Sequence, residues 1–137
     1  MIYIGIDVGT HTGLAIWDSG ARKLLALETL LIHQAMEKVL YWYYKCDGDC
    51  KVIFEDARLR KWYGEKSDAK LQGAGSVKRD SSIWEDFLKD KGIPFQGIHP
   101  LQGMTKLTSI YFKRISKWDG KTSEHSRDAA MLVIGKR

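Results

Sequence analysis

The sequence has only two cysteines and two prolines, and none of its hydrophobic runs reaches membrane-spanning length. Cys46 and Cys50 flank a short polar stretch, and no second pair of cysteines or histidines completes a tetrahedral metal site. Half of a metal site and a disulfide-closed turn are open alternatives, but two free thiols are the favoured interpretation. The N-terminus also lacks the basic start and small-residue cleavage site of a secretory signal. We therefore expect a cytoplasmic, reducing location and no membrane association.

Length and composition indicate a single globular domain. The 137 residues are 44% hydrophobic and 28% charged, which is ordinary for a chain that buries its own core. The sequence contains no internal repeats, low-complexity tracts or linkers. We therefore predict one domain over residues 1–137.

Positive charge is concentrated in the second half of the chain. Residues 1–56 carry 5 Lys/Arg and 8 Asp/Glu, residues 57–91 carry 9 and 6, and residues 92–137 carry 8 and 3. Such a distribution favours a polyanion as partner. A solvated basic face without a partner is the alternative.

The first half of the chain has the pattern of a sheet followed by a covering helix. Apolar and β-branched residues predict strands over 2–8, 12–18 and 23–30, joined by short turns into an antiparallel meander. Apolar residues then recur at helical spacing from 32 to 44. A further short strand, 50–56, ends in two acidic residues.

The second half alternates helices with one more strand. Residues 57–71 are expected to form an exposed basic loop, followed by a helix over about 75–91 and a strand over 95–100. A polar and basic stretch contains a possible helix around 105–115. The last helix is expected to begin at Thr122 or Ser123 and to end at Gly135.

Acidic residues stand at the ends of two predicted strands. Asp7 ends the first, and Glu55 ends the strand that follows the helix. If these strands are parallel neighbours, their carboxyl ends lie side by side, where open α/β sheets place ligand sites. In the last helix His125 and Asp128 are three residues apart and share a face.

The convergence of these four residues would suit a hard divalent cation. Mg²⁺ prefers oxygen ligands, and two such ions about 4 Å apart can activate water and stabilise the leaving oxygen of a phosphodiester. Each residue also has a plain structural alternative. Asp7 could be a turn cap or ion-pair partner, Glu55 an exposed strand end, and His125 with Asp128 a solubilising helix start.

The order of motifs over nearly the whole chain resembles RuvC-type Holliday junction resolvases, which have the RNase H-like fold. The matching stretches are "GIDVGTHTG", "VIFE", "LQGAGSVKRDSSIWEDFLKDKGIPF" and "HSRDAAMLV". The resemblance implies an α/β fold with a mixed five-stranded sheet, a three-stranded antiparallel meander plus parallel strands, flanked by helices. It also implies a homodimer that cuts four-way DNA junctions during recombination and repair. The chain is shorter than a typical cellular resolvase, so a phage-type or divergent member is expected.

Carried over by this resemblance, the metal ligands or their immediate helpers are Asp7, Glu55, His125 and Asp128, with Glu124 as a rival to His125. The expected cofactor is Mg²⁺, as two ions, with Mn²⁺ as a substitute. Lys106 is the first choice for neutralising the scissile phosphate. Asp56 is left out, because it points to the opposite face of a regular strand.

Further residues are candidates for binding DNA. Trp62 and Tyr63 could stack on unpaired bases, or could form a surface pair at a dimer contact. The stretch "GAGSVKR" could present a helix N-terminus to a phosphate. The basic candidates are Arg58, Arg60, Lys61, Lys78, Arg79, Lys113, Arg114 and Lys117.

Three other functions are weighed against a junction endonuclease. "GIDVGTHTG" also looks like the phosphate-binding strand of sugar kinases and actin-like ATPases, but those proteins bind nucleotide between two such domains. Another RNase H-like nuclease, acting on RNA/DNA hybrid or other branched DNA, is the closer alternative. A non-catalytic DNA-binding domain is the third.

Overall fold

The computed structural model describes residues 1–59, 68–100 and 107–137. It contains a five-stranded sheet in the order β3-β2-β1-β4-β5, in which β1 pairs antiparallel with β2 and parallel with β4. The pair β2–β3 is antiparallel and the pair β4–β5 is parallel. The strands are β1 (Ile2–Asp7), β2 (His11–Asp18), β3 (Lys23–Leu31), β4 (Cys50–Glu55) and β5 (Phe95–Ile98). The predicted fold class, an α/β fold with a meander extended by parallel strands, is confirmed.

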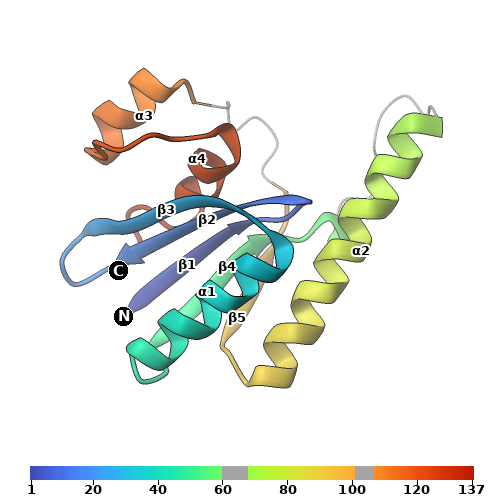
Figure 1. Cartoon of the computed structure of the whole chain (residues 1–137), viewed down its shortest axis with the longest axis horizontal. Helices are drawn as coiled ribbons and strands as arrows, with labels where there is room; N and C mark the ends of the chain where they lie inside the picture. The colour runs from blue at the N-terminus through green and yellow to red at the C-terminus, as the bar shows by residue number, and fades with distance from the viewer. Residues whose placement is uncertain (60–67, 101–106) are drawn as a thin grey trace.

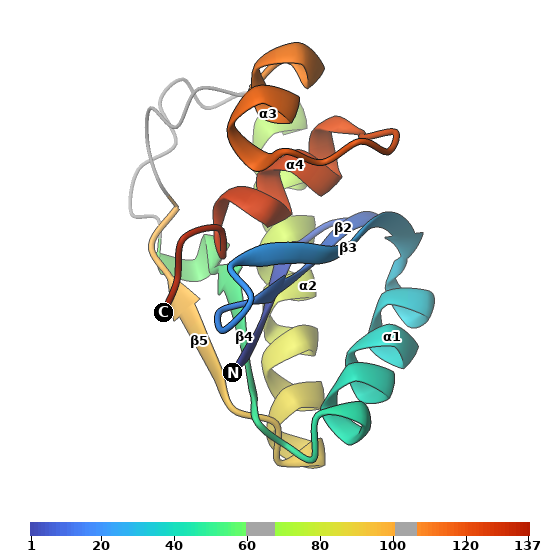
Figure 2. The ribbon, with the colours of Figure 1, turned by 90° about the vertical axis from the view of Figure 1, so that its left-hand side faces the viewer.

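Helices cover both faces of this sheet, as Figures 1 and 2 show. On one face lie α1 (Ile32–Lys45) and α2 (Asp68–Lys91). On the other lie α3 (Ser109–Ser116) and α4 (Glu124–Met131). A short 3-10 helix, η1 (Ala57–Leu59), follows β4. None of the helices in the described ranges is long and apolar enough to cross a membrane.

The alternation of side chains along the strands gives each face its own core. Ile4 and Ile6 of β1 pack with the α1 and α2 side chains, among which Val39 and Trp84 are fully buried. The intervening positions of the strands face α3 and α4, where Phe112 is fully buried. Asp7 is one of these intervening positions, so β1 places it on the side of the sheet that α4 covers.

Two helix boundaries differ from the sequence-based expectation. The loop predicted over 57–71 is wrong for residues 68–71, which belong to α2. A Cβ at Gly73 or Gly75 would meet nothing within 4 Å, so these glycines lie on an open face and the helix runs through them. The last helix ends at Met131 rather than Gly135, because Leu132 and Val133 bond to carbonyls three residues back and tighten the turn.

The two cysteines are free thiols, as favoured from the sequence. Cys46 lies in the turn after α1, and Cys50 begins β4 with 2% of its surface exposed. Burial, together with the neighbouring Cys46 thiol, raises the pKa of Cys50 to about 12. Cys50 is therefore a protonated core residue at neutral pH.

Candidate functional site

The carboxyl ends of β1 and β4 lie side by side. In this parallel pair Ile6 is in register with Phe54, so the next positions, Asp7 and Glu55, stand together at the sheet edge. Both have the parity of the face that α4 covers, since Ile53 packs in the α3 and α4 core. The expected juxtaposition of the two strand ends is confirmed, while the catalytic roles of these residues stay predictions.

Glycines let α4 approach this edge closely. Gly13 lies opposite Asp7 on β2, and a Cβ on it would overlap the carbonyl group of His125. A Cβ on Gly5 would overlap the carbonyl oxygen of Ala129 and come within 3.2 Å of Val133 Cγ1. The backbone of α4 therefore rests directly on β1 and β2, with no side chain between them.

The start of α4 is fixed by polar contacts. Of the two expected candidates, Thr122 and Ser123, the N-cap is Ser123, and its Oγ accepts a hydrogen bond from the Ser126 N–H at 3.1 Å. The Ser123 hydroxyl also bonds to the hydroxyl of Thr29 on β3. These contacts hold the first turn of the helix, which carries His125, above the strand ends.

This placement brings His125 onto Asp7. His125 Nδ1 lies 2.9 Å from Asp7 Oδ2, and the two side chains are 49% and 27% exposed. A carboxylate can only accept, so Nδ1 carries the proton in this bond, and in the neutral ring Nε2 is then an acceptor. The contact thus orients the Asp7 carboxylate at a position that is open to solvent.

His11 is a further member of this edge that the sequence analysis did not single out. Its ring centroid lies 6.5 Å from that of His125, with 29° between the ring planes. His11 begins β2, two residues before the Gly13 that faces Asp7. Its position in "GTHTG", just after Asp7, is the signal that could have identified it.

The side chains at this edge are of types that bind metal ions, and the contact seen among them joins two residues, Asp7 and His125. Carboxylates of Asp7, Glu55 and Asp128 are hard oxygen donors of the kind that Mg²⁺ binds. Over residues 1–59, 68–100 and 107–137, no three His, Cys, Asp or Glu side chains are grouped to hold a metal ion. Of the four predicted ligands, the structure brings Asp7 and His125 into direct contact.

Arg58, predicted to bind DNA, joins the loop after Glu55 to α2. Its guanidinium bonds to Asp56 Oδ2 at 2.6 Å and to Glu85 Oε2 at 2.7 Å. Hydrogen bonds from Arg58 lower the pKa values of both Asp56 and Glu85, and these carboxylates raise the pKa of Arg58. Asp56 is only 5% exposed, which agrees with leaving it out of the primary site. The network fixes the chain that follows Glu55.

The remaining predicted DNA-binding residues fall into three groups. Arg60, Lys61, Trp62 and Tyr63 lie outside the described residues, as does Lys106, the candidate for neutralising the scissile phosphate. Arg79 pairs with its neighbour Asp80 at 3.6 Å and is 68% exposed, and Lys78 stands beside it on α2. The third group, on and just after α3, is exposed to solvent: Lys113, Arg114 and Lys117.

Comparison with known proteins shows a likeness in structure to a viral enzyme. The sequence matches no protein-family model and no curated protein. The chain is similar to a solved structure of Fowlpox virus resolvase in complex with substrate Holliday junction DNA. The two are 16% identical, the match covers 96% of this chain and 84% of that chain, and the TM-score is 0.42.

Proposed function

We propose that this protein is a metal-dependent, structure-selective DNA endonuclease that cleaves Holliday junctions by phosphodiester hydrolysis. One observation carries the proposal: Asp7 and Glu55 stand at the adjoining ends of two parallel strands, and His125 Nδ1 lies 2.9 Å from the Asp7 carboxylate. This is a solvent-accessible group of acid and imidazole at the edge where α/β sheets place their ligand sites.

Asp7, Glu55 and Asp128 would hold magnesium, with Mn²⁺ as a substitute. When bound, two such ions supply an activated water and stabilise the leaving oxygen. His125 fixes the orientation of Asp7 through Nδ1 and can accept a proton at Nε2. Hydrolysis would leave a 5′ phosphate and a 3′ hydroxyl.

Branched DNA as the substrate is supported by the motif resemblance and by the basic second half of the chain. Lysines and arginines that neutralise phosphates would supply affinity for any DNA, and the shape of the junction would supply selectivity. Symmetric cutting of two strands needs two sites, which a two-fold homodimer would provide.

The proposal is tested with labelled four-way junction, linear duplex and RNA/DNA hybrid, each incubated with Mg²⁺ or with a chelator. We expect paired nicks in the junction that disappear with chelator. Binding of Mg²⁺ measured by calorimetry, without DNA, gives a second readout that Asp7→Asn should weaken.

Two results would replace this function by another. Cutting confined to the hybrid would make the chain an RNA-directed nuclease with the same fold. Binding of DNA without cutting of any substrate, in Mg²⁺ or Mn²⁺, would leave a DNA-binding domain.

A further inference from the structure

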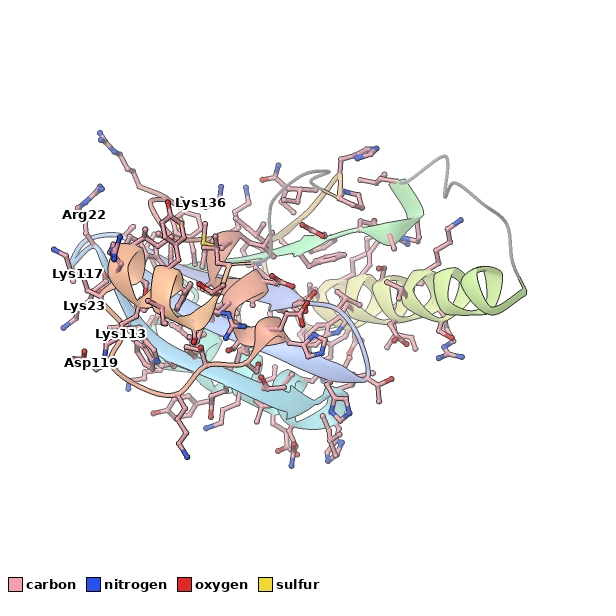
Figure 3. All side chains as sticks on the ribbon, turned by 90° about the horizontal axis from the view of Figure 1, so that it is seen from above. Arg22, Lys23, Lys113, Lys117, Asp119 and Lys136 are labelled. Carbon is pink, nitrogen blue, oxygen red and sulfur yellow. The ribbon has the colours of Figure 1, made fainter. Side chains whose placement is uncertain are left out.

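The end of the molecule away from Asp7 carries lysines and arginines from three separate segments. These are the β2–β3 turn, α3 with the residue after it, and the C-terminal residues that follow α4. Figure 3 shows the side chains at one end of the molecule, together with Asp119. We name this group the distal basic surface, and its members are Arg22, Lys23, Lys113, Lys117 and Lys136.

The distal basic surface is separate from the candidate site. Asp18, which precedes the β2–β3 turn, is in register with Ile2 at the start of β1, whereas Asp7 is at its end. At roughly 3.3 Å per residue, the strand separates the two places by about 17 Å. A ligand that touches both must therefore be long.

Buried side chains tie the three segments together. Phe112 of α3 belongs to the same core as Trp17 and Leu24, which flank the turn. The indole Nε1 of Trp17 donates a hydrogen bond to the carbonyl oxygen of Lys136 at 2.9 Å. The cations are thus carried on elements that pack against a common layer rather than on independent tails.

The backbone of the turn is fixed by its own hydrogen bonds. The Asp18 carboxylate accepts from the N–H groups of Gly20 and Ala21, at 2.9 and 3.0 Å. Ser19 N–H and its hydroxyl both donate to the carbonyl oxygen of Met1, at 3.1 and 2.8 Å. Arg22 then has a φ of 54°, in the left-handed region that glycine or asparagine usually occupies.

The same feature recurs at the end of α3. Lys117 has a φ of 60° and caps the helix, with its N–H bonded to the carbonyl oxygen of Lys113 at 2.9 Å. Lys113 and Lys117 are one helical turn apart and therefore share a face. Two sterically disfavoured backbone positions at this end carry long cations, and such positions concentrate at functional sites.

The charge of this surface is largely uncompensated. The acidic residues next to the three segments are Asp18, whose carboxylate is used within the turn, and Asp119. Within the described ranges, none of the five cations forms an ion pair. Several unpaired positive charges carried on packed elements suit a ligand with many negative charges.

We infer that the distal basic surface binds the phosphate backbone of duplex DNA, as a second contact on an arm of the proposed substrate. The inference rests on the proposed function for the identity of the ligand. Duplex DNA carries one charge per about 1.7 Å of axis and is long enough to reach both places. An anionic membrane is less favoured, because α3 is only eight residues long and turns Phe112 into the core.

The test compares two variants with equal loss of charge. The first replaces Arg22, Lys23, Lys113 and Lys117 by glutamine. The control replaces four lysines of α1 and α2, on the opposite face of the sheet, by glutamine: Lys38, Lys45, Lys89 and Lys91. Binding to a 20-base-pair duplex and to a four-way junction is measured in chelator over a range of salt concentrations, and circular dichroism verifies folding.

We expect the first variant to bind at least about tenfold more weakly, with a salt slope reduced by about 3, while the control stays close to the unmodified chain. Equal losses in both variants would show that only net charge matters and would overturn the inference. Unchanged DNA binding in the first variant would also overturn it. Binding to anionic phospholipid vesicles is measured in parallel, and a loss there without a loss on DNA would overturn the inference as well. Since binding is measured without cleavage, a failure of the proposed nuclease activity would leave this result readable.

Discussion

His125 Nδ1 lies 2.9 Å from Asp7 Oδ2, although the two residues are 118 positions apart in the sequence. The contact depends on Gly13, which faces Asp7 across the β1–β2 pair and leaves room for the His125 carbonyl group. A strand, a glycine on its neighbour and the first turn of α4 together bring the acid and the imidazole into contact.

Adding a methyl group at Gly13 should break this arrangement. In Gly13→Ala the new Cβ would overlap the carbonyl of His125, so α4 must shift away from the sheet. We expect a loss of about 3 kcal/mol in the free energy of unfolding, measured by urea denaturation, and a loss of junction cutting. Gly9→Ala is the matched control, because the nearest atom to its Cβ is the His11 oxygen at 3.7 Å. Equal stability of the two variants would contradict the close packing of α4.

The ion pairs of Arg58 should contribute measurably to stability. Arg58→Met would leave the Asp56 carboxylate, 5% exposed, without its partner. We expect a loss of roughly 2–3 kcal/mol in the free energy of unfolding. Arg79→Met, which removes an exposed arginine paired only with Asp80, should change it by less than about 1 kcal/mol. A large effect at Arg79 with none at Arg58 would refute the network.

The same network predicts how stability depends on pH. Arg58 lowers the pKa values of Asp56 and Glu85 below their ordinary values of 3.8 and 4.5. Protonation therefore favours the unfolded state, and the contribution is complete above those ordinary values and lost as pH falls through the lower folded ones. The difference in stability between the unmodified chain and Arg58→Met should be constant from pH 6 to 5 and shrink below about pH 4. A difference that grows in acid would contradict the direction of these shifts.

Thiol reactivity should separate the two cysteines. Cys50 is 2% exposed and has a pKa raised to about 12, whereas Cys46 is half-buried in a turn. A thiol reagent at neutral pH should modify one thiol in the native protein and two after unfolding. In Cys46→Ser the native protein should show no fast reaction. Two fast thiols, or none even after unfolding without reductant, would contradict free cysteines in these positions.

The sequence was sufficient for the sheet and for the placement of Asp7 beside Glu55. Alternation along β1 and the acidic end of β4 follow from local patterns. The two strand ends could be placed together on the condition, met in the structure, that β1 and β4 are parallel neighbours. The N-cap at Ser123 was predictable for the same reason, since capping is a local property.

Contacts between distant segments were not predictable in this way. Gly13 gives no sign in the sequence that a carbonyl group of α4 lies on it. The position of His11 after Asp7 indicates nearness to the site, but not that its ring meets the ring of His125. Arg58 was assigned to DNA because its neighbours in sequence are basic, but its folded neighbours are Asp56 and Glu85. The sequence-based start of α2 was set after Gly73, but the helix begins before its glycines, which face open space within it.

The central claim is that the Asp7 carboxylate is required for cleavage and not for holding DNA. It is tested most directly with Asp7→Asn, which keeps the size of the side chain, beside Asp86→Asn, which changes an exposed residue of α2. Both are incubated with a labelled four-way junction and Mg²⁺, and binding is measured in parallel.

The account predicts that Asp7→Asn binds the junction like the unmodified chain and cuts it at least about a thousandfold more slowly, a loss of about 4 kcal/mol in transition-state stabilisation. Asp86→Asn should cut normally. Near-normal cutting by Asp7→Asn would contradict the account.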